Sequence, residues 1–247
     1  MTRNAGRDFM RSTCYDRMEA SQQERGLPQP PLELPAPEGV ELLALPAPQD
    51  VHIPALDLRE AIERRKTWRK YREESLNLEE LSFLLWCTQG IKSVTNRPVT
   101  FRTVPSAGAR HAFETYLLVN RVVGVEPGLY RYVASAHALQ LLDQDPGLPE
   151  QLAEACLKQS KIIYSAVSFI WVAVRERMTW RYGERGYRYL HLDAGHVCQN
   201  LYLAAEPVDC GICGIAAFDD ARLNAALNLD GEELFVVYLA SLGKKLR

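Results

Sequence analysis

Residues 165–174 read Ser-Ala-Val-Ser-Phe-Ile-Trp-Val-Ala-Val and decide the fold class of this chain. The run is continuously β-prone, without the alternation of polar and apolar residues that marks a half-exposed strand. A strand of this kind is buried on both faces. We therefore expect residues 165–174 to form a central strand of a sheet.

Further strands are predicted on both sides of this run. Aromatic and aliphatic residues bounded by turn formers occur at residues 113–119, 129–132, 138–142 and 234–242. The second and third of these runs flank a short polar link.

Helices are predicted between the strands by their caps and apolar spacing. Asp57 with Glu60, and Asn77 with Glu80, have capping-box spacing, and Asp219 is placed to cap a short helix through residues 225–227. Residues 193–206 are almost uniformly small or apolar, which indicates a helix buried on all sides, in the core or in a subunit interface, that Pro207 ends. The expected fold class is α+β.

Composition limits the classes of protein to which the chain can belong. The 247 residues are 47% hydrophobic and 24% charged, with 29 Lys and Arg against 31 Asp and Glu, so a sizeable core is available and no global positive field favours nucleic acid. Apolar runs are too short to span a membrane, and the first 20 residues lack the apolar core of a secretory signal. We expect a cytoplasmic protein without nucleic-acid or membrane partners.

Residues 1–54 are predicted to be an N-terminal arm, followed by one domain over residues 55–247. Eight of the 14 prolines lie in residues 28–54, which favours extended chain over helix. Leu32, Leu34, Leu42, Leu43 and Leu45 supply apolar surface, so the arm either packs against the domain or is a flexible tail.

The run Arg64-Arg65-Lys66-Thr67-Trp68-Arg69-Lys70 is the first candidate for a binding site. Guanidinium groups can bind phosphate oxygens in pairs and the Thr67 hydroxyl adds a donor, although most charge runs are only solvated surface. Two stretches of small residues, 101–109 and 210–219, allow close approach of the backbone to a flat ligand. Together the three segments could hold a phosphate and a planar ring.

From about residue 57 to the end, the chain resembles the nitroreductase-like flavoproteins, and among them the SagB-type dehydrogenases of thiazole and oxazole peptide synthesis with their stand-alone relatives. The matching motifs are Arg65-Lys-Thr-Trp-Arg69, Leu78-Glu-Glu-Leu81, Leu85-Trp-Cys-Thr-Gln-Gly90, Arg102-Thr-Val-Pro-Ser-Ala-Gly108, Glu126-Pro-Gly-Leu-Tyr-Arg-Tyr132, Leu192-Asp-Ala-Gly-His196 and Gln199-Asn-Leu201. The resemblance implies a mostly antiparallel central sheet flanked by helices, in an intertwined homodimer with FMN at the interface.

The resemblance also implies roles for residues of this chain. Arg65, Lys66, Thr67 and Arg69 would surround the FMN phosphate and the N1/O2 edge of the ring. Pro105, Ser106, Ala107 and Gly108 would line the ring from the partner subunit, the backbone of Ile215, Ala216 and Ala217 would approach N5, and Lys244 and Lys245 would add a phosphate contact.

A segment rich in Arg and Tyr, residues 177–189, includes Arg181 and Tyr182. The azoline-oxidising relatives carry a Lys-Tyr pair at the corresponding place, thought to remove the substrate proton. Arginine does not readily lose a proton near neutral pH, so Arg181 is expected to bind an anion or orient the substrate. Tyr182 is either a proton donor or a packed side chain with a hydrogen-bonded hydroxyl.

Cysteine and histidine residues raise two alternatives. His191, His196, Cys198 and the pair Cys210 and Cys213 invite a metal interpretation, but no second ligand pair has the spacing of a zinc site, so we expect no metal. Cys210 and Cys213 could instead be a redox dithiol beside the ring, or simply small core residues.

The leading prediction is an FMN-dependent oxidoreductase that transfers two electrons between NADH or NADPH and an organic acceptor. Oxidation of azoline peptides is the alternative enzyme activity, which makes the substrate either a small molecule or a peptide. A flavin-binding protein without turnover is the non-enzymatic alternative.

Overall fold

The structure, a computed structural model, describes residues 4–96 and 98–246. Its centre is a seven-stranded sheet in the order β1-β6-β5-β4-β7-β9-β8, in which every neighbouring pair is antiparallel. The strands are β1 (Leu42–Ala44), β4 (Phe113–Val119), β5 (Gly128–Val133), β6 (Ala138–Asp143), β7 (Val167–Val174), β8 (Cys210–Ile215) and β9 (Leu234–Lys244). The predicted α+β class and antiparallel sheet are confirmed.

Strand β7 lies between β4 and β9, as its sequence predicts. Phe169 and Trp171 point to one core cluster and Ile170 and Val172 to the other, all with 0% exposure, because successive side chains of a strand face opposite sides. Two separate cores therefore sandwich the strand.

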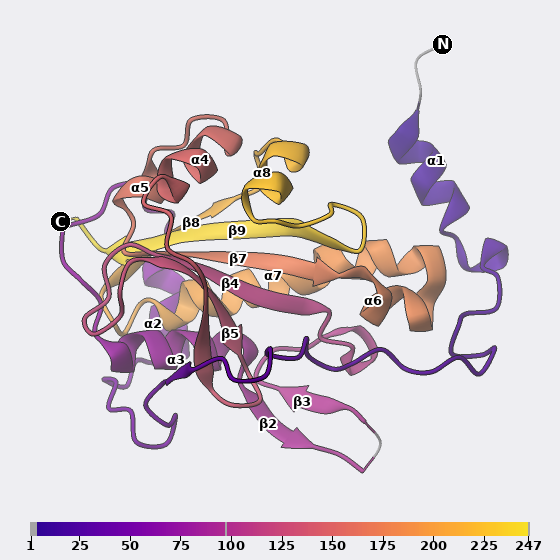
Figure 1. Ribbon diagram of the computed structural model, residues 1–247, viewed down its shortest axis with the longest axis horizontal. Coiled ribbons are helices and arrows are strands. Elements are labelled where there is room, and N and C mark those ends of the chain that lie inside the picture. Colours follow the sequence, from indigo (N-terminus) through magenta and orange to yellow (C-terminus); the bar gives the residue numbers. More distant parts are fainter. Residues whose placement is uncertain (1–3, 97, 247) are drawn as a thin grey trace.

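Helices cover both faces of this sheet (Figure 1). Helices α3 (Leu78–Gln89) and α7 (Gly186–Ala204) pack on one core cluster, and α4 (Leu148–Ala155), α5 (Lys161–Tyr164) and α8 (Asp220–Ala226) on the other. The remaining elements are α1 (Ala5–Ser12), α2 (Leu58–Arg64), α6 (Arg175–Tyr182), the short 3-10 turns η1 (Tyr15–Arg17), η2 (Ala107–Ala109) and η3 (Gly183–Arg185), and the hairpin of β2 (Ile91–Val94) and β3 (Thr100–Arg102). No helix among the described residues is long and apolar enough to cross a membrane.

The predicted caps are confirmed with one exception. Asn77 and Glu80 form both halves of a capping box, and the side chains of Asp57 and Asp219 accept hydrogen bonds from the first turns of α2 and α8. Glu60 was expected to reach back to Asp57, but its carboxylate pairs instead with Arg64 one turn later.

Helix α7 differs from its prediction. It begins at Gly186, seven residues before the predicted start, because the Arg/Tyr-rich segment continues the helix. The prediction that it is buried on all sides does not hold within one chain, since Leu192 is 60% exposed and His196 lies on the same open face. A subunit interface remains the other predicted way to cover that face.

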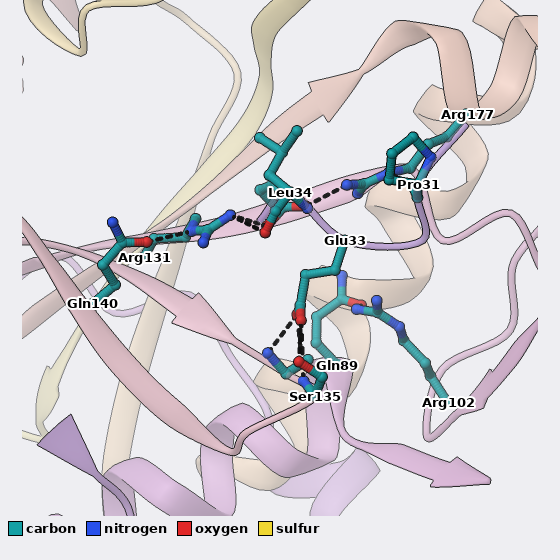
Figure 2. Close-up of polar contacts among 11 residues, drawn as sticks. Pro31, Glu33, Leu34, Gln89, Arg102, Arg131, Ser135, Gln140 and Arg177 are labelled. Carbon is teal, nitrogen blue, oxygen red and sulfur yellow. Dashed lines mark hydrogen bonds and ion pairs between the residues drawn. The ribbon is translucent and has the colours of Figure 1, made fainter. Parts of the chain in front are cut away.

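The proline-rich segment is fastened to the domain by buried charges (Figure 2). Arg177 donates to the Pro31 carbonyl at 2.8 Å, Arg131 donates to the Leu34 carbonyl at 2.7 Å, and the Leu34 N–H donates to Glu114 at 2.9 Å. Glu33 accepts hydrogen bonds from the N–H groups of Ala134 and Ser135. Residues 31–34 therefore pack as part of the domain.

Candidate active site

The basic loop, residues 65–69, lies along the edge strand β8. It directly follows α2, and the Trp68 N–H donates to the Ile212 carbonyl at 2.8 Å while Thr67 forms a parallel bridge with Ile212. Trp68 packs on Gly211, where an added Cβ would lie 2.4 Å from its ring. Glycine at position 211 thus lets the loop approach the sheet closely.

The cations of the loop have no carboxylate partner among the described residues. Arg65 stacks on the Tyr202 ring at 5.5 Å and Lys66 on the Trp68 ring at 4.3 Å, and Arg69 is exposed. None of the three forms an ion pair, whereas Arg64 and Arg72 on either side do. The hydroxyl of Thr67 is exposed between them, so this donor set has the chemistry that a phosphate group requires.

Residues 215–217 lie at the far end of the same strand. Ile215 ends β8, and Ala216 and Ala217 are exposed beyond it. At about 3.3 Å per residue, Ala216 lies roughly 13 Å from Ile212 and the basic loop. The loop therefore lies beside the first half of β8, and residues 215–217 lie at the end of this strand.

Tyr202 of α7 joins the loop to β8, a role that the sequence did not reveal. Its hydroxyl lies 3.4 Å from the Thr67 hydroxyl and accepts a hydrogen bond from the Gly214 N–H at 2.9 Å. No local pattern distinguishes Tyr202 from other apolar positions of its helix.

The segment that is expected to line the ring, residues 105–108, packs against α7 at Asp193. Asp193 accepts a hydrogen bond from the Ala107 N–H at 3.2 Å, and the Ser106 hydroxyl accepts from the His111 N–H at 2.9 Å. Burial raises the pKa of Asp193, while hydrogen bonds from Ser106 and Ala107 oppose that shift. Asp193 thus anchors the segment, about 13 Å along the helix axis from Tyr202.

Arg181 and Tyr182 end α6 beside that segment. The Tyr182 ring packs edge-on against Tyr189 at 4.8 Å, and Arg181 lies over the Tyr182 ring at 5.6 Å. Within the described part of the chain, no hydrogen bond of the Tyr182 hydroxyl is found, so the alternative of a packed tyrosine with a bonded hydroxyl gains no support.

Gly108 is the residue of the segment 105–108 that contacts these two side chains. It has a positive φ of 56°, and a Cβ there would lie 2.4 Å from the Tyr182 hydroxyl. Only glycine fits this backbone conformation and this contact without strain.

Lys244 and Lys245 are occupied by carboxylates. Lys244 pairs with Glu80 at 2.5 Å and Lys245 with Glu206 at 2.6 Å, and neither lysine is exposed. Both amines already have an anionic partner in the chain, so the phosphate contact of these lysines, which stays a prediction, would compete with Glu80 and Glu206.

Strand geometry argues against a dithiol of Cys210 and Cys213. The two residues are three apart in β8, so their side chains face opposite sides of the sheet and belong to different core clusters. A disulfide would require the strand to break. Burial raises the pKa of the Cys210 thiol to about 12, as expected of a core cysteine. No cluster of three or more metal-ligating His, Cys, Asp or Glu occurs in residues 4–96 and 98–246.

Two known proteins are similar to this chain in sequence. A nitroreductase homologue of Methanocaldococcus jannaschii is 36% identical over 195 residues, covering 78% of this chain and 94% of its own length. The trifolitoxin-processing protein TfxB of Rhizobium leguminosarum bv. trifolii is 32% identical over 133 residues, covering 52% of this chain and 36% of that protein.

Three solved structures show the same fold. A nitroreductase homologue of Anabaena variabilis, 29% identical with a TM-score of 0.65, covers 77% of this chain, which spans only 38% of that protein. A homologue of Desulfovibrio desulfuricans in complex with FMN has 19% identity and a TM-score of 0.56 over 78% of this chain and 89% of its own. A chain of the Escherichia coli microcin synthetase complex with truncated pro-MccB17 bound has 16% identity and a TM-score of 0.61 over 97% and 87% of the two chains.

The family model of the nitroreductases matches residues 62–244, which include the basic loop, the segment 105–108 and all of β8. With the antiparallel sheet and the relatives above, this match settles the family. The chain belongs to the nitroreductase family.

Proposed function

We propose that the chain is an FMN-dependent oxidoreductase that passes two electrons from NADH or NADPH to an organic acceptor. The observation that carries the proposal is the set of three cations in the basic loop, Arg65, Lys66 and Arg69, none of which is paired with a carboxylate of the described residues. When bound, FMN would supply hydride acceptance and donation, which no side chain of the protein can supply.

In this proposal Arg65, Lys66, Thr67 and Arg69 hold the phosphate. The parallel bridge to Ile212 fixes the loop backbone, and the contact with Tyr202 orders the Arg65 and Thr67 side chains. A rigid loop reduces the conformational entropy lost on binding.

The remaining FMN contacts are assigned by position along β8 and α7. The backbone of Ile215, Ala216 and Ala217 faces the N5 edge, and Pro105, Ser106, Ala107 and Gly108 line the ring from the partner of a homodimer. Exposed Leu192 on the open face of α7 supports an interface there, because a large apolar side chain that is left in contact with water is suited to packing against a partner.

Arg181 and Tyr182 are proposed to serve the acceptor. The guanidinium keeps its charge and orients an anionic group, and the Tyr182 hydroxyl, without a partner among the described residues, can donate a proton to the reduced acceptor.

Purification with FMN tests the central claim. The protein is expected to be yellow with about one FMN per chain, and anaerobic mixing with NADH or NADPH should bleach the flavin band. A protein that stays colourless after reconstitution would refute the proposal, and one with flavin that no donor bleaches would support a binding protein without turnover.

Loop variants test the phosphate site. Arg69→Gln and Arg65→Gln each remove a charge-assisted hydrogen bond worth about 1.5–3 kcal/mol, so the Kd for FMN should rise roughly 10-fold to 100-fold. Lys70→Gln, in the same run but outside the proposed contacts, is the matched control and should bind FMN as the unaltered protein does.

Oxidation of azoline peptides is the second candidate. It is supported by the similarity to the trifolitoxin-processing protein and the fold shared with the microcin synthetase chain. The protein would be incubated with FMN, oxygen and a synthetic thiazoline peptide, and loss of two hydrogens by mass spectrometry would favour it. Because arginine is a poor base, Arg181→Lys should then increase the rate.

A further inference from the structure

Two arginines, Arg110 and Arg181, both approach Gly108. Arg110 Nε donates to the Gly108 carbonyl at 3.1 Å. A Cβ built on Gly108 would lie 3.0 Å from Arg181 Nε and 2.4 Å from the Tyr182 hydroxyl. The Arg110 and Arg181 side chains, from a loop after β3 and from the end of α6, therefore flank a single residue of the segment 105–108.

Neither arginine has a counter-charge among the described residues. Arg110 is only 4% exposed, stacks on Trp180 at 5.4 Å, and forms no ion pair; Arg181 forms none either. Burial and the nearby Arg181 together lower the pKa of Arg110.

Arg131 and Arg177 differ from Arg110 because each of them has a carboxylate partner. Those two arginines are equally buried, and both pair with the buried Glu114. Arg110 is nearly as buried but has no such partner among the described residues, and a buried cation without one is costly. An anion from outside would compensate Arg110 and could at the same time bind the neighbouring, exposed Arg181.

An open cavity of about 710 Å³ is lined by Arg181 and Tyr182, while Arg110 lies behind Gly108 and outside this lining. Its basic wall carries Arg181 and Arg185, and its other wall, from the N-terminal segment, carries Glu19 and Glu24. Arg185 is engaged, since it donates to the Tyr189 hydroxyl at 2.7 Å and lies over the Tyr15 ring at 4.1 Å. An anionic group that enters is thus directed to Arg181, and the volume suits a small organic molecule.

We propose that Arg110 and Arg181 form a subsite for the anionic group of a substrate, best fitted by a carboxylate on an aromatic acceptor. The placement of the acceptor beside Gly108 and Tyr182 rests on the proposed function. The Arg181 guanidinium supplies paired donors for the carboxylate, Arg110 adds positive charge behind it, and the Tyr182 ring supplies an aromatic surface next to Arg181.

Kinetics with matched acceptors test the subsite. 4-Nitrobenzoate and 4-nitrobenzamide differ mainly in charge, and the unaltered protein should prefer the first in kcat/KM by about tenfold or more. Arg181→Gln should bring the ratio close to one, Arg181→Lys should retain part of the preference, and Arg222→Gln, an exposed arginine of α8, should leave it unchanged. A ratio that Arg181→Gln does not change would overturn the proposal.

Binding measured without turnover separates this proposal from the proposed function. Calorimetric titration of the full chain, with and without FMN, should show benzoate binding, no benzamide binding, and loss of benzoate binding in Arg181→Gln and Arg110→Gln. Arg110→Lys, which keeps the charge, checks that a loss in Arg110→Gln is not misfolding. If FMN does not bind but benzoate does, the proposed function fails and the subsite stands; if benzoate does not bind, the subsite fails.

The anion could also belong to the electron donor. If Arg181→Gln raised the KM for NADPH but not for NADH, and left the acceptor ratio unchanged, the subsite would belong to the 2′-phosphate of NADPH and the acceptor assignment would be wrong.

Discussion

Replacement of Glu114 by glutamine should strongly destabilise the protein. The Glu114 side chain is 2% exposed and lies between two arginines that are equally buried, 2.6 Å from Arg177 and 3.5 Å from Arg131. It also accepts the Leu34 N–H at 2.9 Å, which holds the proline-rich segment. Glu114→Gln keeps the shape of the side chain but removes the carboxylate that both ion pairs share. Two buried guanidinium charges are then uncompensated.

Removing one partner of a buried ion pair costs about 3–5 kcal/mol. With a urea m value of about 3 kcal/mol/M, near the top of the range for small proteins, the midpoint of unfolding should fall by roughly 1–1.7 M. Urea titration followed by tryptophan fluorescence measures the shift. Residues 28–45 should also become more sensitive to limited proteolysis, because the Leu34 contact is weakened.

Two further variants make the reasoning refutable. Glu126→Gln changes an exposed carboxylate without an ion pair and should shift the midpoint by less than about 0.2 M. Glu114→Gln combined with Arg177→Met should be less destabilising than the sum of the single changes, since the double variant buries one charge fewer. A midpoint for Glu114→Gln equal to that of Glu126→Gln would refute the account of the network.

Variants at Gly108, His111 and Leu192 each have an expected effect. Gly108→Ala should lower turnover and stability, because φ is 56° and the new methyl would overlap the Tyr182 hydroxyl; adding Tyr182→Phe should recover part of the stability in thermal unfolding but not the turnover. Burial, with Arg102 and Arg110, lowers the pKa of His111 to about 3. In the unfolded chain the pKa of His111 is near 6.5, so the unfolded state binds the proton at a higher pH than the folded state does. Stability is therefore lost as pH falls from about 6.5 toward 3, and urea titrations of His111→Gln should show a shallower loss. Leu192→Glu should shift a dimer to monomer in sedimentation velocity and weaken FMN binding, and a protein that is monomeric before the change would contradict the proposed shared site.

The sequence determined the elements whose signals are local. The run 165–174 predicted the central strand, runs of aromatic and aliphatic residues predicted β4, β5, β6 and most of β9, and Asn77 with Glu80 predicted the start of α3. In each case the pattern lies within ten or so residues, and the hydrogen bonds that it favours are made by neighbours in the chain.

Helix α6 shows where local patterns gave no prediction. Residues 175–182 are mostly polar, and they form a helix with Arg177 buried because Glu114 on β4 compensates its charge. The strand β8 likewise depends on a partner, β9, that is distant in sequence.

The tertiary structure alone decided how the candidate residues are grouped and which charges are free. It placed the basic loop and residues 215–217 along β8, brought Gly108 between Arg110 and Arg181, and paired Lys244 and Lys245 with Glu80 and Glu206. The physical reason is that the availability of a charged side chain depends on its neighbours in space. An ion pair between residues 164 positions apart, such as Lys244 and Glu80, cannot be predicted from the local sequence.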